Sequence, residues 1–379
     1  MDPAACRALF PVLEQRLFFN HAGIAPCSTR VIAAMRTVLA EQAGLGSAGY
    51  PLWCERTAAV RRQAAAFIGA VAAEIAFVPN TSTGLGLIAE SLPWQPGEAV
   101  LVATPDFPAN VYPWRHLARR GVTVVDVPRR HGAIEAADVA RALVPGARLL
   151  AVSSVDFATG FAADLPALGA FCREHGLLLA VDAIQSLGLL PLDVKRCGID
   201  ALACGAHKWL CGPQGIGLLY LSAELLPRLV PPLVGWKSVV DPEAFGRDFE
   251  LRGDAAIFEP GTLDITAIAG LGAALELLAE VGAERIRQQV AALCGALIEG
   301  LERRGWPVAG PREPAARGGI VAFGEAARSP ALFAYLTANG VVAALREGRV
   351  RLSPHFANNA AEVGRFFTLL DRYPGSAAA

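Results

Sequence analysis

One apolar stretch carries four polar residues whose types and spacing could do chemistry. In residues 177–220, Asp182 ends an apolar run, Gln185 follows one turn later, and His207 and Lys208 stand together in a glycine-rich frame. Lysine is rarely buried without a partner or a catalytic role, and the residues around Lys208 are apolar. Because desolvation lowers the pKa of a lysine, Lys208 is a candidate nucleophilic amine that forms a Schiff base.

Helices and strands that alternate along the chain must position these residues. Apolar runs predict strands at residues 75–78, 99–103, 123–127, 149–153, 178–182, 201–204 and 216–221. Amphipathic patterns predict helices at residues 28–42, 55–68, 82–91, 109–119, 136–143 and 166–175. The strand runs are apolar throughout, which is typical of strands that helices cover on both faces. We therefore expect an α/β fold with a doubly wound, mostly parallel sheet.

A smaller α+β unit is expected after a break in this alternation. Residues 230–253 are rich in Pro, Gly and charge and predict a long functional loop. The later pattern predicts helices at residues 264–279, 283–304 and 359–370, and strands at residues 319–323, 341–344 and 349–352. We expect a large domain at residues 15–264 and a small domain at residues 265–379, with residues 1–14 folded onto it.

Five polar clusters each follow a different predicted strand. They are Asn80–Thr83, Asp106–Pro108, Ser154 with Asp156, Asp182 with Gln185, and Lys208. Ligands of open α/β sheets bind outside the carboxyl ends of the strands. We therefore expect these clusters to form one site at that edge of the sheet.

Two of these clusters suggest what the site binds. Thr81 and Ser82 open a predicted helix, where hydroxyls, free N–H groups and the helix dipole favour a phosphate; an ordinary N-cap explains them equally. Asp182, as a buried carboxylate, needs a cationic partner. A protonated pyridine nitrogen is one, since enzymes that use pyridoxal 5′-phosphate (PLP) pair that nitrogen with an aspartate. A helix cap is the alternative for Asp182.

The composition excludes several classes of protein. Of 379 residues, 53% are hydrophobic and 18% are charged, which indicates a globular chain with a sizeable core. The formal net charge of −1 argues against nucleic acid and anionic membranes as partners. The sequence shows no secretory signal and no membrane-spanning run, and its eight cysteines form no CxxC pair. We therefore expect a cytoplasmic protein with reduced thiols and no metal site.

Longer segments around these residues resemble a known family. The cofactor signature of class V aminotransferases, which are fold-type I PLP enzymes, is similar to VDAIQSLG and, after a spacer, GAHKWLCGPQGIGLLYL. The family's phosphate turn resembles FVPNTSTGLGLIAES, its ring-stacking segment DFPANVYPW, and its subunit-bridging segment FEPGTLD. Its substrate segments resemble FFNHAGIAPCS and VRLSPHFANNAAEV. This family includes cysteine desulfurases, kynureninases and isopenicillin-N-epimerase-like proteins, and the resemblance implies PLP as the cofactor.

The resemblance implies a role for each polar residue of the central stretch. Lys208 would hold PLP as a Schiff base and then carry the substrate's α-proton as general base and acid. Asp182 would keep the pyridine nitrogen protonated, so that the ring withdraws electrons. Gln185 would hydrogen-bond the phenolic oxygen of the ring, and His207 would help to hold the phosphate.

Residues elsewhere in the chain would complete this site by the same resemblance. Thr81 and Ser82 would hold the phosphate, and Thr262 would contribute from the partner subunit, which implies a homodimer. Phe107 would stack on the ring where many relatives have a histidine, without the proton-transfer capacity of imidazole.

The substrate side of the site would be built around Arg351. Its guanidinium would clamp a substrate carboxylate bidentately, near Asn20 and His21. His355 lies in the same motif and is expected to be structural.

The chain departs from the family pattern at two places. Gly205 stands where many relatives have a phosphate-binding serine. Cysteine desulfurases carry a nucleophilic cysteine shortly before the substrate arginine, but residues 337–350 contain none, and the last cysteine is Cys294. A desulfurase that forms a protein persulfide needs that thiolate. Arg346 and Arg349 instead add positive charge there, either for a second carboxylate or as solvated side chains.

These observations lead to a ranked set of functions. We expect a PLP-dependent enzyme that acts on a small amino acid, with transamination first and C–S β-elimination or epimerisation as alternatives. A non-catalytic PLP-fold binding protein is an alternative of a different class, although Lys208 and Asp182 are both present. A nicotinamide-dependent oxidoreductase is disfavoured because Gly84-Leu85-Gly86 lacks the third glycine of GxGxxG.

Overall fold

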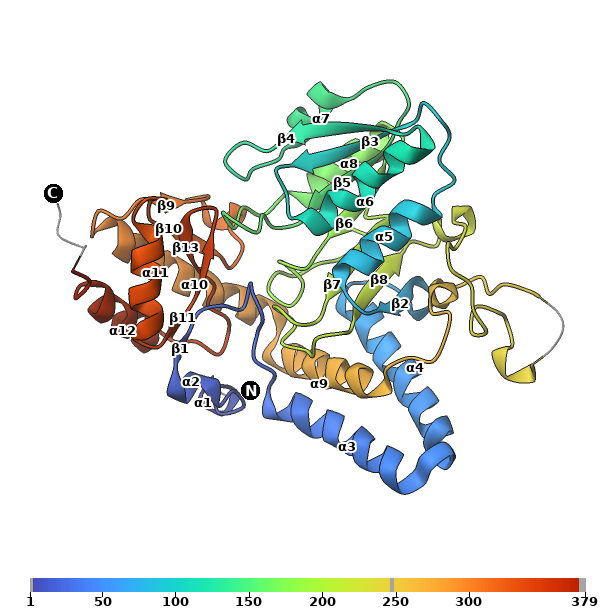
Figure 1. Ribbon diagram of the computed structural model, residues 1–379, viewed down its shortest axis with the longest axis horizontal. Helices are drawn as coiled ribbons and strands as arrows, with labels where there is room; N and C mark the ends of the chain where they lie inside the picture. Colours follow the sequence, from blue (N-terminus) through green and yellow to red (C-terminus); the bar gives the residue numbers. More distant parts are fainter. Residues whose placement is uncertain (1–2, 246–248, 375–379) are drawn as a thin grey trace.

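A seven-stranded sheet forms the centre of the larger unit (Figure 1). The computed structural model describes residues 3–245 and 249–374. In spatial order the strands are β2 (Ile75–Val78), β8 (Gly217–Leu221), β7 (Ala201–Gly205), β6 (Leu178–Asp182), β5 (Ala147–Ser153), β3 (Ala99–Thr104) and β4 (Thr123–Pro128). Each begins and ends within two residues of its predicted bounds. Strand β8 runs antiparallel to both of its neighbours, and the other pairs in this sheet are parallel.

Helices cover both faces of this sheet, as the apolar strands predicted. In β5, Leu150 and Val152 join the core that contains α4 (Tyr50–Phe67) and α9 (Ile265–Val281). Leu149 and Ala151 join the core that contains α5 (Thr81–Ser91) and α6 (Tyr112–His116). The helices of this unit are α3 (Thr29–Leu45), α4 (Tyr50–Phe67), α5 (Thr81–Ser91), α6 (Tyr112–His116), α7 (Ala136–Ala142), α8 (Leu165–Glu174) and α9 (Ile265–Val281). The predicted doubly wound α/β fold is confirmed.

One predicted helix differs in form. Residues 109–119 form three short pieces, with 3₁₀ turns at Pro108–Asn110 and Leu117–Arg120 on either side of α6. Pro113 lies at the start of α6 and has no N–H to continue a helix from the preceding residues. The proline therefore restarts the helix instead of extending it.

The C-terminal residues form a smaller unit around a four-stranded antiparallel sheet, at the left of Figure 1. Its strand order is β12 (Ala344–Arg346), β13 (Arg349–Leu352), β10 (Val321–Phe323) and β9 (Val308–Ala309). The accompanying helices are α10 (Ala283–Glu302), α11 (Ser329–Ala338) and α12 (Ala360–Leu370). Helix α11, which the sequence analysis did not predict, is apolar on several sides, so its pattern has no clear helical period.

The N-terminal residues lie against this smaller unit. Helices α1 (Pro3–Arg7) and α2 (Val12–Gln15) lead into β1 (Leu17–Phe18), which pairs in parallel with β11 (Val341–Val342). Arg7 forms an ion pair with the buried Glu362 of α12. Helix α9 packs against α3 and α4 of the larger unit (Figure 1). The division into domains at residues 15–264 and 265–379 stays a prediction.

The predicted loop at residues 230–253 leaves many apolar side chains exposed. A bridge between Val239 and Leu251 and a short 3₁₀ turn at Pro242–Ala244 are its regular features. Residues 246–248 of this prediction lie outside the described part of the chain. Trp236 stacks on Phe245, with 6.4 Å between ring centroids, and both are exposed.

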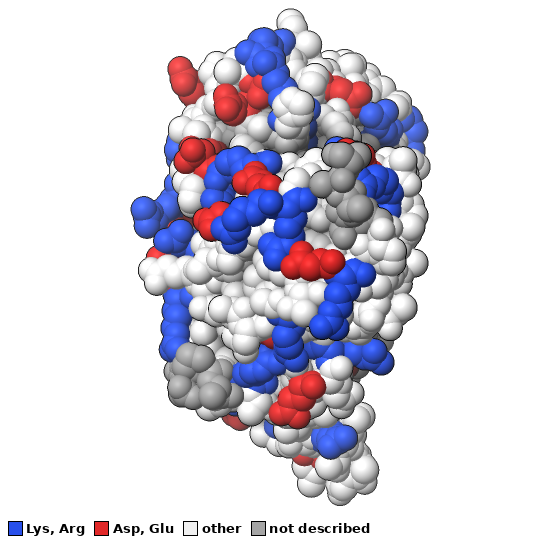
Figure 2. Space-filling model, turned by 90° about the vertical axis from the view of Figure 1, so that its left-hand side faces the viewer, with Lys and Arg blue, Asp and Glu red and all other residues white. Residues whose placement is uncertain are grey.

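The surface and the helix lengths bear on possible partners. Basic and acidic side chains occur together on the face shown in Figure 2, so this face carries no field of a single sign. Within residues 3–245 and 249–374, no single helix is long and apolar enough to cross a membrane. Helices α9 and α10 reach the required length and apolar composition only when they are taken together, and they meet at a bend of 78°.

Candidate active site

A cavity of about 470 Å³ lies between the carboxyl ends of the central strands and the C-terminal unit. Nine of the predicted site residues line it, namely Asn20, Thr81, Ser82, Phe107, Asp182, Gln185, His207, Lys208 and Arg351. The segments after β2, β3, β5, β6 and β7 supply one wall. The β12–β13 hairpin and the N-terminal residues Asn20, Ala22, Gly23 and Ile24 supply the rest. The parallel direction of these strands brings residues more than 100 positions apart to one edge, as the sheet rule predicts.

The first turn of α5 offers a site for an anion. Asn80 caps this helix, since its side-chain oxygen accepts a hydrogen bond from the N–H of Thr83 (2.8 Å). The hydroxyl of Thr81 accepts a bond from the N–H of Gly205 (2.9 Å), so its own hydrogen remains available to a ligand. Ser82 is exposed beside it. Hydroxyls at a helix start favour a phosphate.

His207 lines this side of the cavity, and Gly205 lies beside its ring. A Cβ at Gly205 would lie 3.1 Å from Nδ1 of His207 and 3.2 Å from Cδ1 of Ile184. A serine at residue 205 would therefore crowd the present His207 ring. Burial and the charge of Lys208 lower the pKa of His207 below its usual 6.5, so a neutral ring is favoured.

Asp182 is a buried carboxylate with one oxygen unpaired. It ends β6, and its Oδ1 accepts a hydrogen bond from the N–H of Ile184 (2.9 Å). Its Oδ2 is buried without a hydrogen-bond partner. Burial raises the pKa of Asp182 to about 7. A buried carboxylate of this kind calls for a cationic N–H donor from a ligand.

Lys208 has the properties of an amine that reacts near neutral pH. It follows β7 in a turn, and its Nζ lies 5.5 Å from the centroid of the Phe107 ring. Burial lowers its pKa to about 8, with Asp182 opposing the shift and Arg351 adding to it. At this pKa about one tenth of the amine is unprotonated at pH 7, far more than for an ordinary lysine, and the unprotonated form is the one that a nucleophile or proton acceptor requires.

A hydrogen-bond network fixes the side chain of Gln185. Trp209 donates from Nε1 to Gln185 Oε1 (2.8 Å), and Gln185 Nε2 donates to the carbonyl of Ala22 (3.1 Å). His355 Nδ1 accepts from the N–H of Phe356, so its Nε2 carries the proton and donates to the Trp209 carbonyl (2.8 Å). Burial lowers the pKa of His355 to about 4, which keeps this ring neutral. The sequence analysis missed Trp209; its place directly after Lys208 was the available signal.

Phe107 and Phe157 form an aromatic wall. Their ring centroids are 5.5 Å apart in an edge-to-face arrangement. Asp106 holds the backbone here, because its Oδ1 accepts from the N–H of Phe107 (2.7 Å) and its Oδ2 pairs with Arg129 (3.0 Å). The Asp106 and Arg129 side chains are fully buried. They position the ring and do not themselves line the cavity.

Arg351 is buried, with free capacity to bind an anion. Its Nη1 donates to the carbonyl of Phe157 (2.7 Å), while its Nε is buried without a partner. Burial and the neighbouring charge of Arg346 lower its pKa to about 10. Asn20, whose Oδ1 is also buried without a partner, lines the same cavity. A planar guanidinium of this kind suits a carboxylate.

Two predicted site residues lie outside this cavity. His21 is buried in an aromatic cluster with Trp209 and His355, and its Nδ1 lies 3.0 Å from the carbonyl of Ser353. Its ring is not among the cavity's lining side chains. Thr262 is exposed and lies apart from the cavity of its own chain. Their roles toward substrate and partner subunit stay predictions.

Ser154 and Asp156 also belonged to the predicted polar edge. The Ser154 hydroxyl donates to the carbonyl of Asp182 (3.0 Å), and Oδ1 of Asp156 accepts from the hydroxyl of Thr159 (2.7 Å). Both side chains therefore stabilise the loops around the site instead of lining it.

Comparison with known proteins decides the family. The model of the family Aminotransferase class-V matches residues 17–363. The chain belongs to the class-V aminotransferase family. It is 31% identical to an uncharacterized aminotransferase of Bacillus subtilis over 95% of both chains. It is 32% identical to a probable cysteine desulfurase of Methanothermobacter thermautotrophicus, over 73% of this chain and 70% of that protein.

Solved structures of other proteins share the fold. The apo cysteine desulfurase of Thermococcus onnurineus superposes with a TM-score of 0.90 at 27% identity, over 98% of both chains. A mutant of the lyase C-DES with glycine covalently linked to its PLP cofactor gives 0.91 at 26% identity, over 97% of this chain and 99% of that one. The cystine C–S lyase C-DES in complex with its product cysteine persulfide superposes with a TM-score of 0.90 at 26% identity, over 96% of this chain and 99% of that one. The chain is thus a fold-type I, PLP-dependent enzyme.

The residues of this class-V site fit PLP. The unpaired Oδ2 of Asp182 suits the ring nitrogen, and the α5 start with Thr81 suits the phosphate. Lys208 lines the same cavity with a lowered pKa. Bound PLP supplies an electron-withdrawing ring that stabilises negative charge at Cα of an amino acid.

Proposed function

We propose that this class-V enzyme is an aminotransferase that acts on a small amino acid. The observation that carries the proposal is one cavity that Lys208, Asp182 and Arg351 line together and that no cysteine lines. Asp182 Oδ2 and Arg351 Nε are both buried without a hydrogen-bond partner. Lys208 would hold the cofactor and then move the α-proton at its Nζ. Arg351 would bind the substrate carboxylate, and Phe107 and Phe157 would limit water on one side.

The cysteines support transamination over persulfide formation on the protein. All eight are described and free, and none lines the cavity. Burial raises the pKa of the thiols nearest in sequence to Lys208, those of Cys204 and Cys211. A nucleophilic thiol needs a lowered pKa and access to the substrate. Phe107 likewise offers no proton to a departing sulfur.

A C–S lyase is the second candidate. The likeness to the cystine C–S lyase C-DES and to probable cysteine desulfurases favours it. In such a reaction the protein would need a base at Lys208 but no thiol of its own. Epimerisation is a third outcome that the same proton transfer at Lys208 permits.

Single-substrate incubations test these alternatives. The PLP-loaded protein is mixed with one amino acid at a time, and the cofactor spectrum and the released products are followed. Accumulation of the amine form of the cofactor with an oxo acid supports transamination. Pyruvate, ammonia or a reduced sulfur species, without the amine form, would favour the lyase and overturn the proposal.

Arg351→Ala provides a check of the carboxylate clamp. Loss of a bidentate partner should raise KM for amino acids by ten- to a hundredfold, while the amount of bound cofactor changes little. An unchanged KM would remove Arg351 from the substrate site.

We further propose a cytoplasmic homodimer. Trp236, Phe245 and Phe249 remain 43%, 79% and 72% exposed in the single chain. An exposed apolar surface of this extent is typical of a protein interface, and the exposed Thr262 suits a contribution to the partner's site. Eight free cysteines suit a reducing compartment.

A further inference from the structure

The β12–β13 hairpin presents three arginines on one face. Arg346 pairs with Arg349, and Arg351 follows Arg349 by two residues on the same strand. Paired residues, and residues two apart, point to the same face of a sheet. The connecting residues Glu347 (φ 47°) and Gly348 (φ 69°) form a tight two-residue turn. This register fixes where Arg346 projects.

In the described residues, no acidic side chain forms an ion pair with any of these three arginines. Arg346 donates to the carbonyl of Leu345 (2.8 Å), and Arg351 donates to the carbonyl of Phe157 (2.7 Å). The charge of Asp156 acts against the lowering of the Arg351 pKa, but Asp156 Oδ1 accepts hydrogen bonds from the N–H and the hydroxyl of Thr159. Like charges placed opposite each other destabilise a hairpin. We therefore expect these arginines to bind an anion that is not part of the chain.

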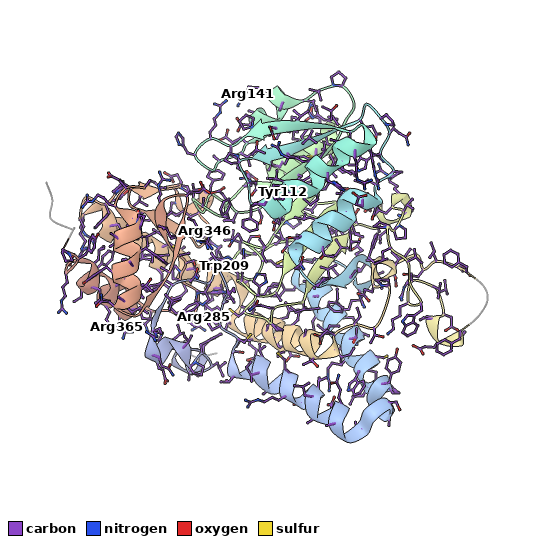
Figure 3. All side chains as sticks on the ribbon, viewed as in Figure 1. Tyr112, Arg141, Trp209, Arg285, Arg346 and Arg365 are labelled. Carbon is purple, nitrogen blue, oxygen red and sulfur yellow. The ribbon has the colours of Figure 1, made fainter. Side chains whose placement is uncertain are left out.

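Arg346 and Arg351 line the same cavity, and Arg349 does not. Figure 3 shows Arg346 where the C-terminal unit faces the central sheet. The charged residues of the cavity wall are Lys208, Arg346, Arg351 and Asp182. The cofactor would engage Lys208 and Asp182, and its phosphate would lie at the start of α5. The α-carboxylate of a substrate would engage Arg351, which leaves the charge of Arg346 unmatched.

We propose that Arg346 forms a second anion subsite that selects amino acids with an anionic side chain, such as a side-chain carboxylate. This inference rests on the proposed binding of an amino acid through Arg351. It does not depend on which bond to Cα then breaks. Because Arg346 is exposed to water, we expect a preference of about tenfold and not of several hundredfold.

Binding of matched acids and amides tests the subsite. The PLP-loaded protein is titrated with L-aspartate and L-glutamate and with their neutral isosteres, L-asparagine and L-glutamine, while the cofactor absorbance is followed. We expect each acid to bind about tenfold more tightly than its amide at low salt. The preference should shrink as ionic strength rises.

Two variants of the same hairpin assign this preference to one residue. Arg346→Gln should lower the affinity for both acids about tenfold and change that for the amides by less than about threefold. Arg349→Gln removes the same charge from the paired position outside the cavity and should keep the preference. Thermal unfolding of both variants checks that the hairpin stays folded.

Three outcomes would overturn the subsite. They are equal binding of acids and amides by the unmodified protein, equal losses for both ligand types in Arg346→Gln, and no loss in that variant. Equal losses would instead place Arg346 on the α-carboxylate beside Arg351. Failure of the aminotransferase proposal is separate, because it appears as absence of the cofactor's amine form while the binding preference remains measurable.

Discussion

The buried surroundings of Asp182 favour its protonated form as long as no cationic ligand group binds to it. Burial raises its pKa from 3.8 to about 7, so the folded, cofactor-free protein keeps a proton that the unfolded chain releases. This carboxyl therefore contributes stability below about pH 4, and the contribution is lost as the pH rises through about 7. A protonated ring nitrogen beside Oδ2 would remove that cost, which links cofactor binding to stability.

Asp182→Asn should make the cofactor-free protein more stable, and more so at pH 8.5 than at pH 5. The neutral amide removes a buried charge that exists only at the higher pH, and we expect a difference of about 1–3 kcal/mol. Thermal unfolding at the two pH values measures it, with the exposed Asp126→Asn as control. If the substitution changed the stability by the same amount at both pH values, Asp182 would not carry a destabilising buried charge at pH 8.5. The same variant should bind PLP far more weakly.

Lys208 should react with the cofactor at a lower pH than an ordinary lysine. Its pKa of about 8 means that the free amine becomes the major form as the pH rises through 8. The rate at which the cofactor-free protein takes up PLP should therefore rise to a plateau with a midpoint near pH 8. In Arg351→Gln the midpoint should move upward, because a nearby positive charge is gone. A rate that keeps rising to pH 10 would contradict the lowered pKa.

Trp209 should act as a positioning residue through Gln185. Trp209→Phe leaves Gln185 Oε1 buried without its donor, so the amide is free to turn its oxygen toward the cofactor. We expect about tenfold weaker PLP binding and a shifted pH midpoint of the cofactor absorbance. Trp94→Phe removes a similar buried bond, to the carbonyl of Ala89, and should leave both readouts unchanged. If both variants changed PLP binding and the pH midpoint by the same amount, Trp209 would contribute to packing only.

Helix α5 positions its anion site by the way it starts. Asn80 caps the first turn, and Thr81 is tied to Gly205 at the end of the neighbouring β7. The phosphate site is thus shared by a helix and a strand that lie next to each other, and does not depend on a flexible loop.

Thr81→Val should weaken PLP binding by ten- to a hundredfold, since a hydrogen bond to a charged group is worth about 1.5–3 kcal/mol. Thr83→Val is the matched control, because the Thr83 hydroxyl donates to Asn80 within the cap and does not line the cavity. Titration of the cofactor-free proteins with PLP measures both. Losses of the same size in the two variants would mean that helix stability, not the Thr81 hydroxyl, accounts for the effect.

At the scale of the whole molecule, apolar side chains such as Phe245 stay exposed, and the exposed Thr262 does not line the cavity of its own chain. Both observations favour assembly with a second copy of the chain. We expect sedimentation to show a dimer. Lys208→Ala protein mixed with Thr262→Ala protein should regain activity beyond the sum of the two, because a mixed dimer has one site with both residues intact. A monomer with full cofactor occupancy, or mixing without a gain, would contradict a shared site.

The sequence by itself determined the central sheet and the edge of that sheet at which the polar residues of the site gather. Apolar strands such as Leu178–Asp182 can form only where helices cover both faces, so their order along the chain predicts a doubly wound fold. Asp182 ends one such strand and Lys208 follows another, and this local pattern was enough to predict that they meet. Local patterns were weaker for α11, whose apolar residues have no clear period, and for residues 109–119, where Pro113 restarts the helix.

The tertiary structure alone decided which polar groups face the cavity and which of them lack a partner. His21 belongs to a substrate-like motif, yet its ring packs beside Trp209, while Arg346 reaches the cavity through the register of a hairpin. The unpaired Oδ2 of Asp182 is likewise visible only once every neighbour is placed. These properties depend on contacts between residues far apart in the chain. No local periodicity encodes such contacts, because each depends on the packing of several elements at once.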